Sequence, residues 1–154
     1  MWKNIQTMKR KFASDYDICP TTYLLPEDYR KLMTDRDYDN GKSFYIIKPN
    51  ASSCGKGISV LGPNDPLPKK QGCLISKYIA NPHLIDGLKY DLRIYVLVTS
   101  YEPLKVYLFR EGLVRFATEK YSTNPNSLKK RFVHLTNYSV NKKAEGYMRN
   151  TDKQ

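Results

Sequence analysis

The pattern of apolar and polar positions divides the chain into a helical beginning and a β-rich remainder. Near the start, four apolar side chains recur at intervals of three and four: Trp2, Ile5, Met8 and Phe12. This spacing predicts a short amphipathic helix. Residues 26–28, Pro-Glu-Asp, have the chemistry of a second helix start, because proline suits the first position and acids suit the positive end of the helix dipole. We expect this helix to continue through about Met33, and the polar run 35–42, which contains Asn-Gly, to form a turn-bearing connection.

From Ser43 onward, the chain consists of short runs rich in β-branched and aromatic residues, separated by Gly, Pro and Asn. The runs are SFYIIK, ISVL, CLISKYI, YDLRIYVLV, LKVYLF and LVRFAT. Glu111-Gly112 is a short turn signal between the last two, so we expect Leu104 to Arg110 and Leu113 to Thr118 to pair as an antiparallel hairpin. The pattern predicts an α/β chain of the α+β kind, with mostly antiparallel sheets and short helices.

The run from Lys89 to Val98 is expected to form one strand whose side chains alternate between two faces. The positions that share the polar face are Lys89, Asp91, Arg93 and Tyr95. The positions on the opposite face, which is continuously apolar, are Tyr90, Leu92, Ile94, Val96 and Val98. We expect the apolar face to lie against the core. Taken alone, the polar face also fits a solvated ladder of charged side chains.

Composition narrows the class of protein. The 154 residues fit one ordinary domain or part of a larger one, and a hydrophobic fraction of 40% with 13 tyrosines is enough for a packed core. No stretch approaches the roughly 20 apolar residues of a membrane span, and the basic first residues lack the apolar segment of a secretory signal. Cys19, Cys54 and Cys73 show no disulfide or zinc spacing, so an intracellular, reducing location is expected.

The charge of the chain points to an acidic partner. Lys and Arg number 26 against 15 Asp and Glu, which gives a formal net charge of +11. Such an excess favours nucleic acid, an anionic membrane or an acidic protein, and charge alone does not separate the three.

Three features carry candidate chemistry. Lys48 ends an apolar strand and precedes the small-residue loop Asn50 to Ile58, in which backbone N–H groups and the lysine charge could contact a polyphosphate. The spacing is not that of a Walker loop, so an ordinary surface hairpin remains an alternative. Arg115 also fits an exposed strand arginine. His134 fits a structural histidine, because no nucleophile pattern accompanies it and no catalytic triad is indicated.

Five linked motifs are far more specific than any of these residues alone. They are KPNASSCGKGI, LISKYI, LIDGLKYDLRIYVLVTS, YLFREGLVRFAT and HLTNYSVNK. In this order and spacing, from about Met1 to Lys143, the chain strongly resembles the tubulin tyrosine ligase-like family, which comprises ATP-dependent amino-acid ligases of the ATP-grasp fold. HLTNYSVNK and YVLVTSYEPL look most like the polyglutamylase branch, which adds glutamate to tubulin, whereas glycine-adding and tyrosine-adding relatives remain alternatives.

The resemblance implies a two-step reaction. ATP lies between two sheets, and a substrate carboxylate attacks its γ-phosphate to give an acylphosphate. The amino group of a free glutamate then displaces phosphate and forms an amide. A glutamate side chain on the acidic tubulin tail would be the acceptor, in agreement with the basic charge of the chain. Because both steps build negative charge on oxygen, fixed cations are the main catalytic groups.

By position, the resemblance assigns residues to three tasks. The catalytic cations are Arg93 and Arg115. The residues assigned to ATP are Lys48, Cys54, Gly55, Ser76, Lys77, Tyr78, Ile79, Lys89, Asp91, Thr136 and Asn137. Of these, residues 76–79 resemble the hinge whose backbone contacts adenine. The residues assigned to the amino-acid substrate are Arg115, Tyr138 and Ser139. A planar, bidentate donor such as Arg115 suits a carboxylate.

The chain also departs from the family pattern. Relatives often carry Arg or Gln where this chain has Cys54, which bears on substrate positioning. ATP and Mg²⁺ are the implied cofactors, but the family's magnesium ligands, an acidic residue and a later Glu-x-Asn pair, are expected downstream of Gln154. Residues 1–40 resemble the end of an N-terminal substrate-facing region, and residues 41–154 the central and partial C-terminal ATP-grasp region. We therefore expect a core fragment that alone incorporates little glutamate.

Two other classes of protein are open alternatives. One is a non-catalytic module that binds nucleotide or tubulin tails, and the other is a nucleic-acid-binding domain. Base stacking needs exposed aromatic rings, whereas Tyr90 is expected on the core side, so no nucleic-acid partner is predicted. The resemblance predicts a monomer that acts on tubulin tails with free glutamate in the cytoplasm. The expected location is the cytoskeleton, including a cilium or flagellar basal body, and no membrane partner is expected.

Overall fold

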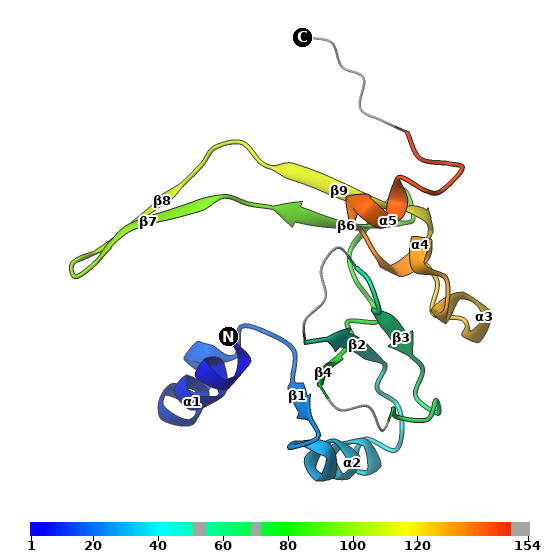
Figure 1. Ribbon diagram of the computed structural model, residues 1–154, viewed down its shortest axis with the longest axis horizontal. Coiled ribbons are helices and arrows are strands. Elements are labelled where there is room, and N and C mark those ends of the chain that lie inside the picture. The colour runs from blue at the N-terminus through cyan, green and yellow to red at the C-terminus, as the bar shows by residue number, and fades with distance from the viewer. Residues whose placement is uncertain (51–54, 69–71, 149–154) are drawn as a thin grey trace. The chain divides into compact units, whose positions relative to one another are not determined.

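The computed structural model describes residues 1–50, 55–68 and 72–148 of the chain (Figure 1). These residues divide into two compact units, Met1–Asn81 and Pro82–Gln154. The division falls elsewhere than the predicted 40/41 boundary, which stays a prediction about family domains. Across the described ranges, no helix is both long enough and apolar enough to cross a membrane.

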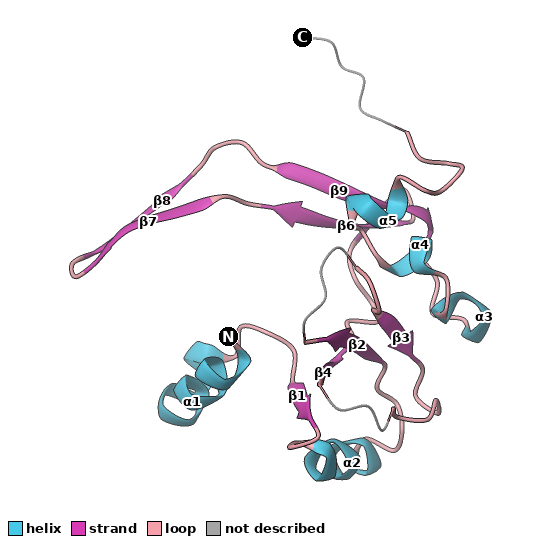
Figure 2. Cartoon of the chain, in the orientation of Figure 1, coloured by secondary structure: helices cyan, strands magenta, loops and turns pink. Residues whose placement is uncertain are grey.

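The first unit is built on a four-stranded sheet with the strand order β1-β4-β2-β3 (Figure 2). Its strands are β1 (Thr22–Leu25), β2 (Tyr45–Pro49), β3 (Ser59–Leu61) and β4 (Cys73–Lys77). All three pairings are antiparallel, which confirms the predicted sheet type. β4 therefore lies between β1 and β2, and both neighbours fix the backbone of its last residues.

Two α-helices and a short 3₁₀-helix belong to the first unit. α1 (Trp2–Phe12) confirms the predicted amphipathic helix, and the 3₁₀-helix Ala13–Tyr16 follows it. Of the four apolar positions, Trp2, Ile5 and Met8 are half-buried, whereas Phe12 is exposed.

The second predicted helix was wrong at both of its ends. α2 (Tyr29–Tyr38) begins after residues 26–28, which form a turn in which the Asp28 carboxylate accepts a hydrogen bond from the Leu24 N–H at 2.9 Å. It also continues into the polar run that was expected to be a connection. Tertiary contacts explain this extension, because Tyr23 donates its hydroxyl hydrogen to Asp35 at 2.7 Å and so binds the last turn of the helix. The Asn-Gly signal is confirmed, since both residues have positive φ angles of 53° and 65°.

The core of the first unit lies between α2 and the sheet. Its buried side chains come from both elements and form one cluster: Tyr23, Leu25, Leu32, Tyr45, Cys73 and Ile75. Leu32 is the contribution of α2, and Ile75 is that of the central strand β4. Burial of these large side chains is the main stabilising term for the unit.

The second unit contains two antiparallel pairings that continue into one long ribbon (Figure 1). β5 (Leu84–Ile85), β6 (Leu88–Arg93) and β9 (Leu113–Lys120) form one sheet. β7 (Val96–Tyr101) and β8 (Leu104–Leu108) form the other. The predicted single strand from Lys89 to Val98 is therefore interrupted at residues 94 and 95.

The predicted hairpin across Glu111-Gly112 was wrong. The chain instead reverses at Glu102-Pro103, so β8 pairs with β7 and β9 pairs with β6. Gly112 is a site of close backbone approach, because a Cβ atom there would lie 2.8 Å from the carbonyl oxygen of Arg93. Because glycine has no side chain, its backbone can lie close to the Arg93 carbonyl group at the point where the strand pairing is interrupted.

The predicted grouping of Lys89 and Asp91 on one face of β6 agrees with their contacts to the same segment, residues 134–136, but the predicted burial of the two faces was wrong. Leu92 is 59% exposed and Ile94 is 56% exposed, although both were expected in the core. Lys89 and Asp91, on the polar face, are half-buried instead. The polar face is partly covered because Lys89 donates to the His134 carbonyl oxygen and Thr136 donates to Asp91. The apolar side chains of the ribbon stay exposed among the residues described.

Three one-turn helices follow β9. They are α3 (Pro125–Leu128), α4 (Arg131–His134) and α5 (Tyr138–Asn141). Both α4 and α5 pack against this strand, and α3 packs against α4. Apolar side chains of the helices are buried, as is Ala117 of β9; these side chains are Leu128, Val133 and Val140, together with Leu135, which follows α4. This packing holds the segment 134–138, which contains three of the predicted site residues, on the β6–β9 sheet.

Candidate functional site

Of the residues of the first unit that were predicted to bind phosphate, Lys48 lies at the end of β2. Lys48 is the last residue but one of this strand, and its side chain is exposed. Cys54 lies outside the described residues. Gly55 is buried and has a φ angle of 76°, a left-handed conformation that favours glycine.

The predicted adenine hinge, residues 76–79, comprises the last two residues of the central strand β4 and the two residues that follow it. The Lys77 N–H donates to the Thr21 carbonyl oxygen, and the Tyr78 N–H donates to the Phe44 carbonyl oxygen, each at 2.8 Å. The Ser76 hydroxyl is 2.8 Å from the Thr22 hydroxyl. These contacts hold the segment on both sides, which is the rigidity that an adenine-binding strand requires.

The Lys77 side chain has its own partner in the first unit. Its Nζ lies 3.5 Å from the Asp39 carboxylate, which follows the last residue of α2. Burial opposes ionisation of Asp39, but hydrogen bonds from Ser43 and Lys42, together with the charge of Lys77, lower the pKa of Asp39. The aspartate is therefore ionised and holds the lysine beside the hinge.

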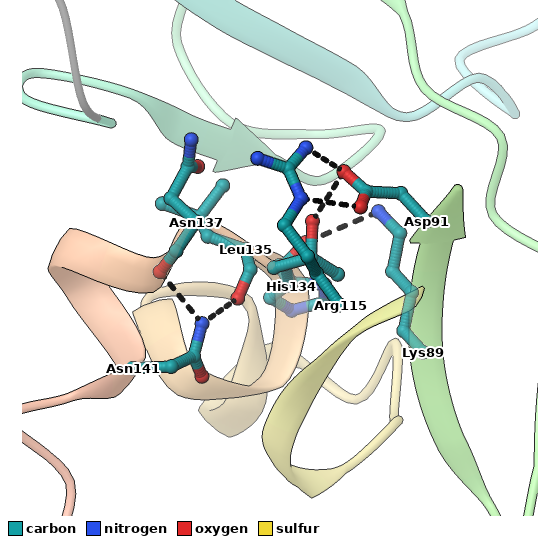
Figure 3. A network of polar contacts seen from close by, with 8 residues as sticks. Lys89, Asp91, Arg115, His134, Leu135, Asn137 and Asn141 are labelled. Atoms are coloured by element: carbon teal, nitrogen blue, oxygen red, sulfur yellow. Dashed lines mark hydrogen bonds and ion pairs between the residues drawn. The ribbon is translucent and has the colours of Figure 1, made fainter. Parts of the chain in front are cut away.

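In the second unit, Asp91 and Arg115 form a two-point ion pair (Figure 3). They are directly opposite each other on β6 and β9. Arg115 donates from Nε to Oδ1 at 2.7 Å and from Nη2 to Oδ2 at 2.5 Å. The bidentate geometry predicted for Arg115 is thus present, but its partner within the chain is an aspartate.

Two further predicted residues join this pair. The Thr136 hydroxyl donates to Oδ2 of Asp91 at 2.9 Å, and the Lys89 Nζ donates to the His134 carbonyl oxygen at 3.1 Å. Burial alone would raise the pKa of Asp91, but hydrogen bonds from Arg115 and Thr136, with the charges of Arg115 and Arg93, lower it. The pKa of Arg115 is raised, chiefly by its hydrogen bond to Asp91.

His134 is structural, in agreement with the sequence analysis. It is 3% exposed, and its Nε2 donates to the Ser127 carbonyl oxygen at 3.1 Å. Burial lowers the pKa of His134, and the nearby charge of Lys89 acts in the same direction. The ring is therefore neutral and fixes the segment from which the Lys89 acceptor comes.

The sequence analysis missed Asn141, the last residue of α5, which is 1% exposed. Its Oδ1 accepts hydrogen bonds from the N–H and the hydroxyl of Thr118 at 3.0 and 3.1 Å. Its Nδ2 donates to the carbonyl oxygens of Leu135 at 2.7 Å and Asn137 at 3.1 Å (Figure 3). The only sequence signal was its place in the motif HLTNYSVNK.

A cavity of about 520 Å³ opens beside the ion pair. Its lining includes the predicted substrate residues Arg115 and Tyr138 and the predicted nucleotide residue Thr136. The Tyr138 ring lies 6.1 Å from the Tyr147 ring and 5.3 Å from the Lys142 ammonium group. The remaining lining is largely apolar: Ile85, Asp86, Leu88, Val114, Phe116, Ala117, Thr118, Asn141, Gly146, Tyr147 and Met148. Ser139 is half-buried and does not line the cavity.

Comparison with known proteins decides the family. The model of the tubulin-tyrosine ligase family matches residues 1–154, the whole chain. The chain belongs to the tubulin-tyrosine ligase family. This membership confirms the resemblance found from the five motifs, and the mixed sheets and helices agree with the ATP-grasp-like fold of the family.

Individual relatives of this family are tubulin glutamylases by name. Tubulin monoglutamylase TTLL4 of Mus musculus is 45% identical over 153 residues, which are 99% of this chain and 13% of that protein. Tubulin polyglutamylase TTLL5 of Homo sapiens is 43% identical over 149 residues, 96% of this chain and 12% of that protein. Tubulin polyglutamylase TTLL7 of Mus musculus is 38% identical over 152 residues, 96% of this chain and 17% of that protein. The chain thus spans less than a fifth of each relative.

The described residues of this tubulin-tyrosine ligase family member include cations in both units but do not form a metal site. Lys48 and Arg93 are exposed, and the Lys89 ammonium group donates to the His134 carbonyl oxygen. Within the described ranges, no group of three or more His, Cys, Asp or Glu side chains could hold a metal ion. Asp91 has both carboxylate oxygens bound by Arg115 and Thr136. These side chains do not fit Mg²⁺, and no reaction step is assigned to it.

Proposed function

We propose that this chain contributes the nucleotide-binding and amino-acid-binding residues of an ATP-dependent ligase that adds glutamate to the glutamate side chains of tubulin tails. The reaction would form an acylphosphate on the tail and then an amide with free glutamate. The glutamylase names of the relatives support the choice of glutamate. Because the proposed substrate is tubulin, the proposed site of action is the cytoskeleton.

The observation that carries the proposal is the cluster of Asp91, Arg115 and Thr136, in which Arg115 and Thr136 line the cavity and Asp91 binds both of them. Arg115 donates from Nε and Nη2 to Asp91. Its Nη1 makes no hydrogen bond within the part of the chain that the structure describes. We assign the carboxylate of the incoming glutamate to this third nitrogen. The contact is a charge-assisted hydrogen bond to an arginine that Asp91 already orients.

The role that we propose for each side chain follows from its chemistry. In the first unit, Lys48 would bind phosphate oxygens of ATP, and the backbone of residues 76–79, the end of β4 and the two residues after it, would receive the adenine. In the second unit, Lys89 would offer a further cation to a phosphate oxygen. Arg93 carries a cation on the same strand as Asp91 and would face the charge that develops on the acylphosphate. Each of these groups stabilises negative charge on oxygen, which is what both chemical steps require.

The chain's formal net charge of +11 supports an acidic acceptor. A glutamate-rich tubulin-tail peptide should bind more tightly than a scrambled peptide of equal charge, and both complexes should weaken with salt because exposed charges are screened. Equal binding of the two peptides, with tighter binding of single-stranded DNA, would reject the tubulin assignment in favour of a nucleic-acid-binding domain.

The test of catalysis is glutamate transfer by the whole protein, measured with ATP, Mg²⁺, microtubules and radiolabelled glutamate. Arg115→Gln removes the charge that orients the substrate, and transfer should fall by about 10-fold to 100-fold, the range for lost hydrogen bonds to charged groups. Arg110→Gln, an exposed arginine of the same unit, is the matched control and should retain the rate. ATP and tail binding without any transfer would favour the non-catalytic module instead.

The test of the nucleotide site is calorimetry with ATP. Lys48→Ala should weaken ATP binding by about 1.5 to 3 kcal/mol, whereas Lys3→Ala, which removes an exposed lysine of α1, should have little effect. Equal affinities of the Lys48→Ala variant and the original chain would remove Lys48 from the nucleotide site.

A further inference from the structure

The contacts of Asn141 close a circuit of hydrogen bonds around Thr136. The circuit leaves β9 at Thr118, passes through the Asn141 amide to the carbonyl groups on either side of Thr136, and continues through the Thr136 hydroxyl to Asp91. It returns to β9 at Arg115. Both ends of the circuit thus lie on one strand, three positions apart.

The chemistry of these contacts requires a primary amide. The Thr118 N–H needs an acceptor, and the carbonyl oxygens of Leu135 and Asn137 need donors. A carboxylate or an apolar side chain cannot supply both, whereas an asparagine offers an oxygen acceptor and an NH₂ donor. Because Asn141 is almost fully buried, water does not replace these bonds at low cost.

The two carbonyl groups that Asn141 holds belong to the residues that flank Thr136. Their positions set the direction of the Thr136 side chain, and the Thr136 hydroxyl occupies Oδ2 of Asp91, the same oxygen that accepts from Nη2 of Arg115. A displaced Thr136 would leave this oxygen with one donor fewer. The orientation of the guanidinium fork therefore depends on the asparagine, although the two side chains do not touch.

We propose that Asn141 is a positioning residue that holds Thr136 on Asp91 and thereby fixes the direction in which Arg115 presents its remaining nitrogen to the amino-acid substrate. The last clause rests on the proposed function, whereas the positioning of Thr136 does not. Asn141 lines the same cavity as Arg115 and Thr136, so its effect is expected at that cavity.

The positioning can be measured without any ligand. In the 154-residue chain, pH titration of the Asp91 carboxyl carbon by NMR reports whether Thr136 still donates to it. Asn141→Leu should raise the pKa of Asp91, in the same direction as Thr136→Val, because both remove a hydrogen bond that stabilises the carboxylate. The double variant should equal Thr136→Val alone. The control is Thr7→Val, which removes an exposed threonine hydroxyl of α1 and should leave the titration unchanged.

A second variant tests the same role in case Asn141→Leu does not fold. Asn141→Ser keeps an oxygen for Thr118 but is too short to reach both carbonyl groups, and it should shift the Asp91 titration in the same direction as Asn141→Leu. An unshifted titration in a folded Asn141→Leu or Asn141→Ser chain would overturn the positioning role.

Kinetics of the whole protein then test the link to the substrate. Asn141→Ser should raise the KM for glutamate by about tenfold, the effect of one weakened hydrogen bond to a charged group. A shifted Asp91 titration with an unchanged KM for glutamate would overturn the assignment of Arg115 to glutamate, and the positioning of Thr136 would stand.

Discussion

Asp91 and Arg115 face each other across the paired strands β6 and β9, and their side chains meet through two hydrogen bonds. Strand pairing fixes both Cα atoms, so the removal of either side chain leaves the other in place and unpaired. The pair is only partly shielded from water, with side chains 37% and 26% exposed. Its contribution to stability is accordingly that of a well-oriented surface pair.

A double-mutant cycle should measure this pair. Asp91→Ala and Arg115→Ala together should destabilise the chain less than the sum of the single changes, with a coupling of about 1 kcal/mol, because screening by water limits the interaction. Urea unfolding gives the four free energies. The control cycle uses Lys130 and Glu119, which approach to 3.9 Å with both side chains largely exposed, and it should show no measurable coupling. Similar couplings in the two cycles would argue against a special role for the bidentate geometry.

Stability should depend on pH through His134. Burial lowers its folded-state pKa below the ordinary value of 6.5, so near and below that value the unfolded chain binds a proton that the folded chain does not. Unfolding then takes up a proton, and stability falls as the pH drops from about 7 toward the folded-state pKa. Urea unfolding of His134→Gln should lose this dependence, whereas His83→Gln, the change at the exposed histidine, should retain it. The same slope in both variants would contradict the prediction.

The core of the first unit should be sensitive to the loss of volume at Leu32. This side chain is 0% exposed between Tyr23, Tyr45 and Ile75. Leu32→Ala should destabilise the unit by about 2 to 5 kcal/mol, since a cavity adds to the lost hydrophobic transfer. The matched substitution Leu104→Ala, at a side chain that is 67% exposed, should cost less than about 0.5 kcal/mol. Thermal unfolding followed by circular dichroism would detect the difference, and equal melting temperatures would place the core elsewhere.

Gly112 should not tolerate a side chain. A Cβ atom there would meet the Arg93 carbonyl oxygen at 2.8 Å, and backbone cannot yield as the end of a flexible side chain can. Gly112→Ala should therefore destabilise the β6–β9 pairing by about 1 to 3 kcal/mol, visible as faster hydrogen exchange of the β6 amides. Gly146→Ala is the control, because a Cβ atom at that position has no neighbour within 4 Å. Unchanged exchange in Gly112→Ala would show that the ribbon adapts at this point.

The sequence predicted those features that depend on neighbouring residues. The amphipathic helix of residues 2–12, the positive-φ turn at Asn40-Gly41 and the strand runs each rest on a local signal that the structure confirms. His134 was interpreted as structural because no nucleophile pattern accompanies it, and the structure places its ring in the buried interior with a backbone partner. The resemblance of the motifs gave the family, which no single local pattern would have given.

Features that depend on distant partners were not predicted correctly. Two turn signals compete around β8, and the choice of Glu102-Pro103 over Glu111-Gly112 depends on whether β8 finds β7 or β9. The alternation of β6 gave the right two faces, but which one is covered depends on where residues 134–138 pack. Asn141 needs Thr118 and the carbonyl groups of Leu135 and Asn137 to converge, and a sequence pattern does not reveal that convergence.

The continuous ribbon also bears on the order of folding. If β6 and β9 paired first, the chain would have to close a loop from residue 94 to residue 112, and the entropy of closure grows with loop length. β7 and β8 are separated only by Glu102-Pro103, so their pairing costs the least entropy, and its growth brings Arg93 opposite Leu113. We therefore expect the hairpin tip to form early and Arg115 to reach Asp91 late, so that the ion pair assembles only after most of the ribbon has zipped together.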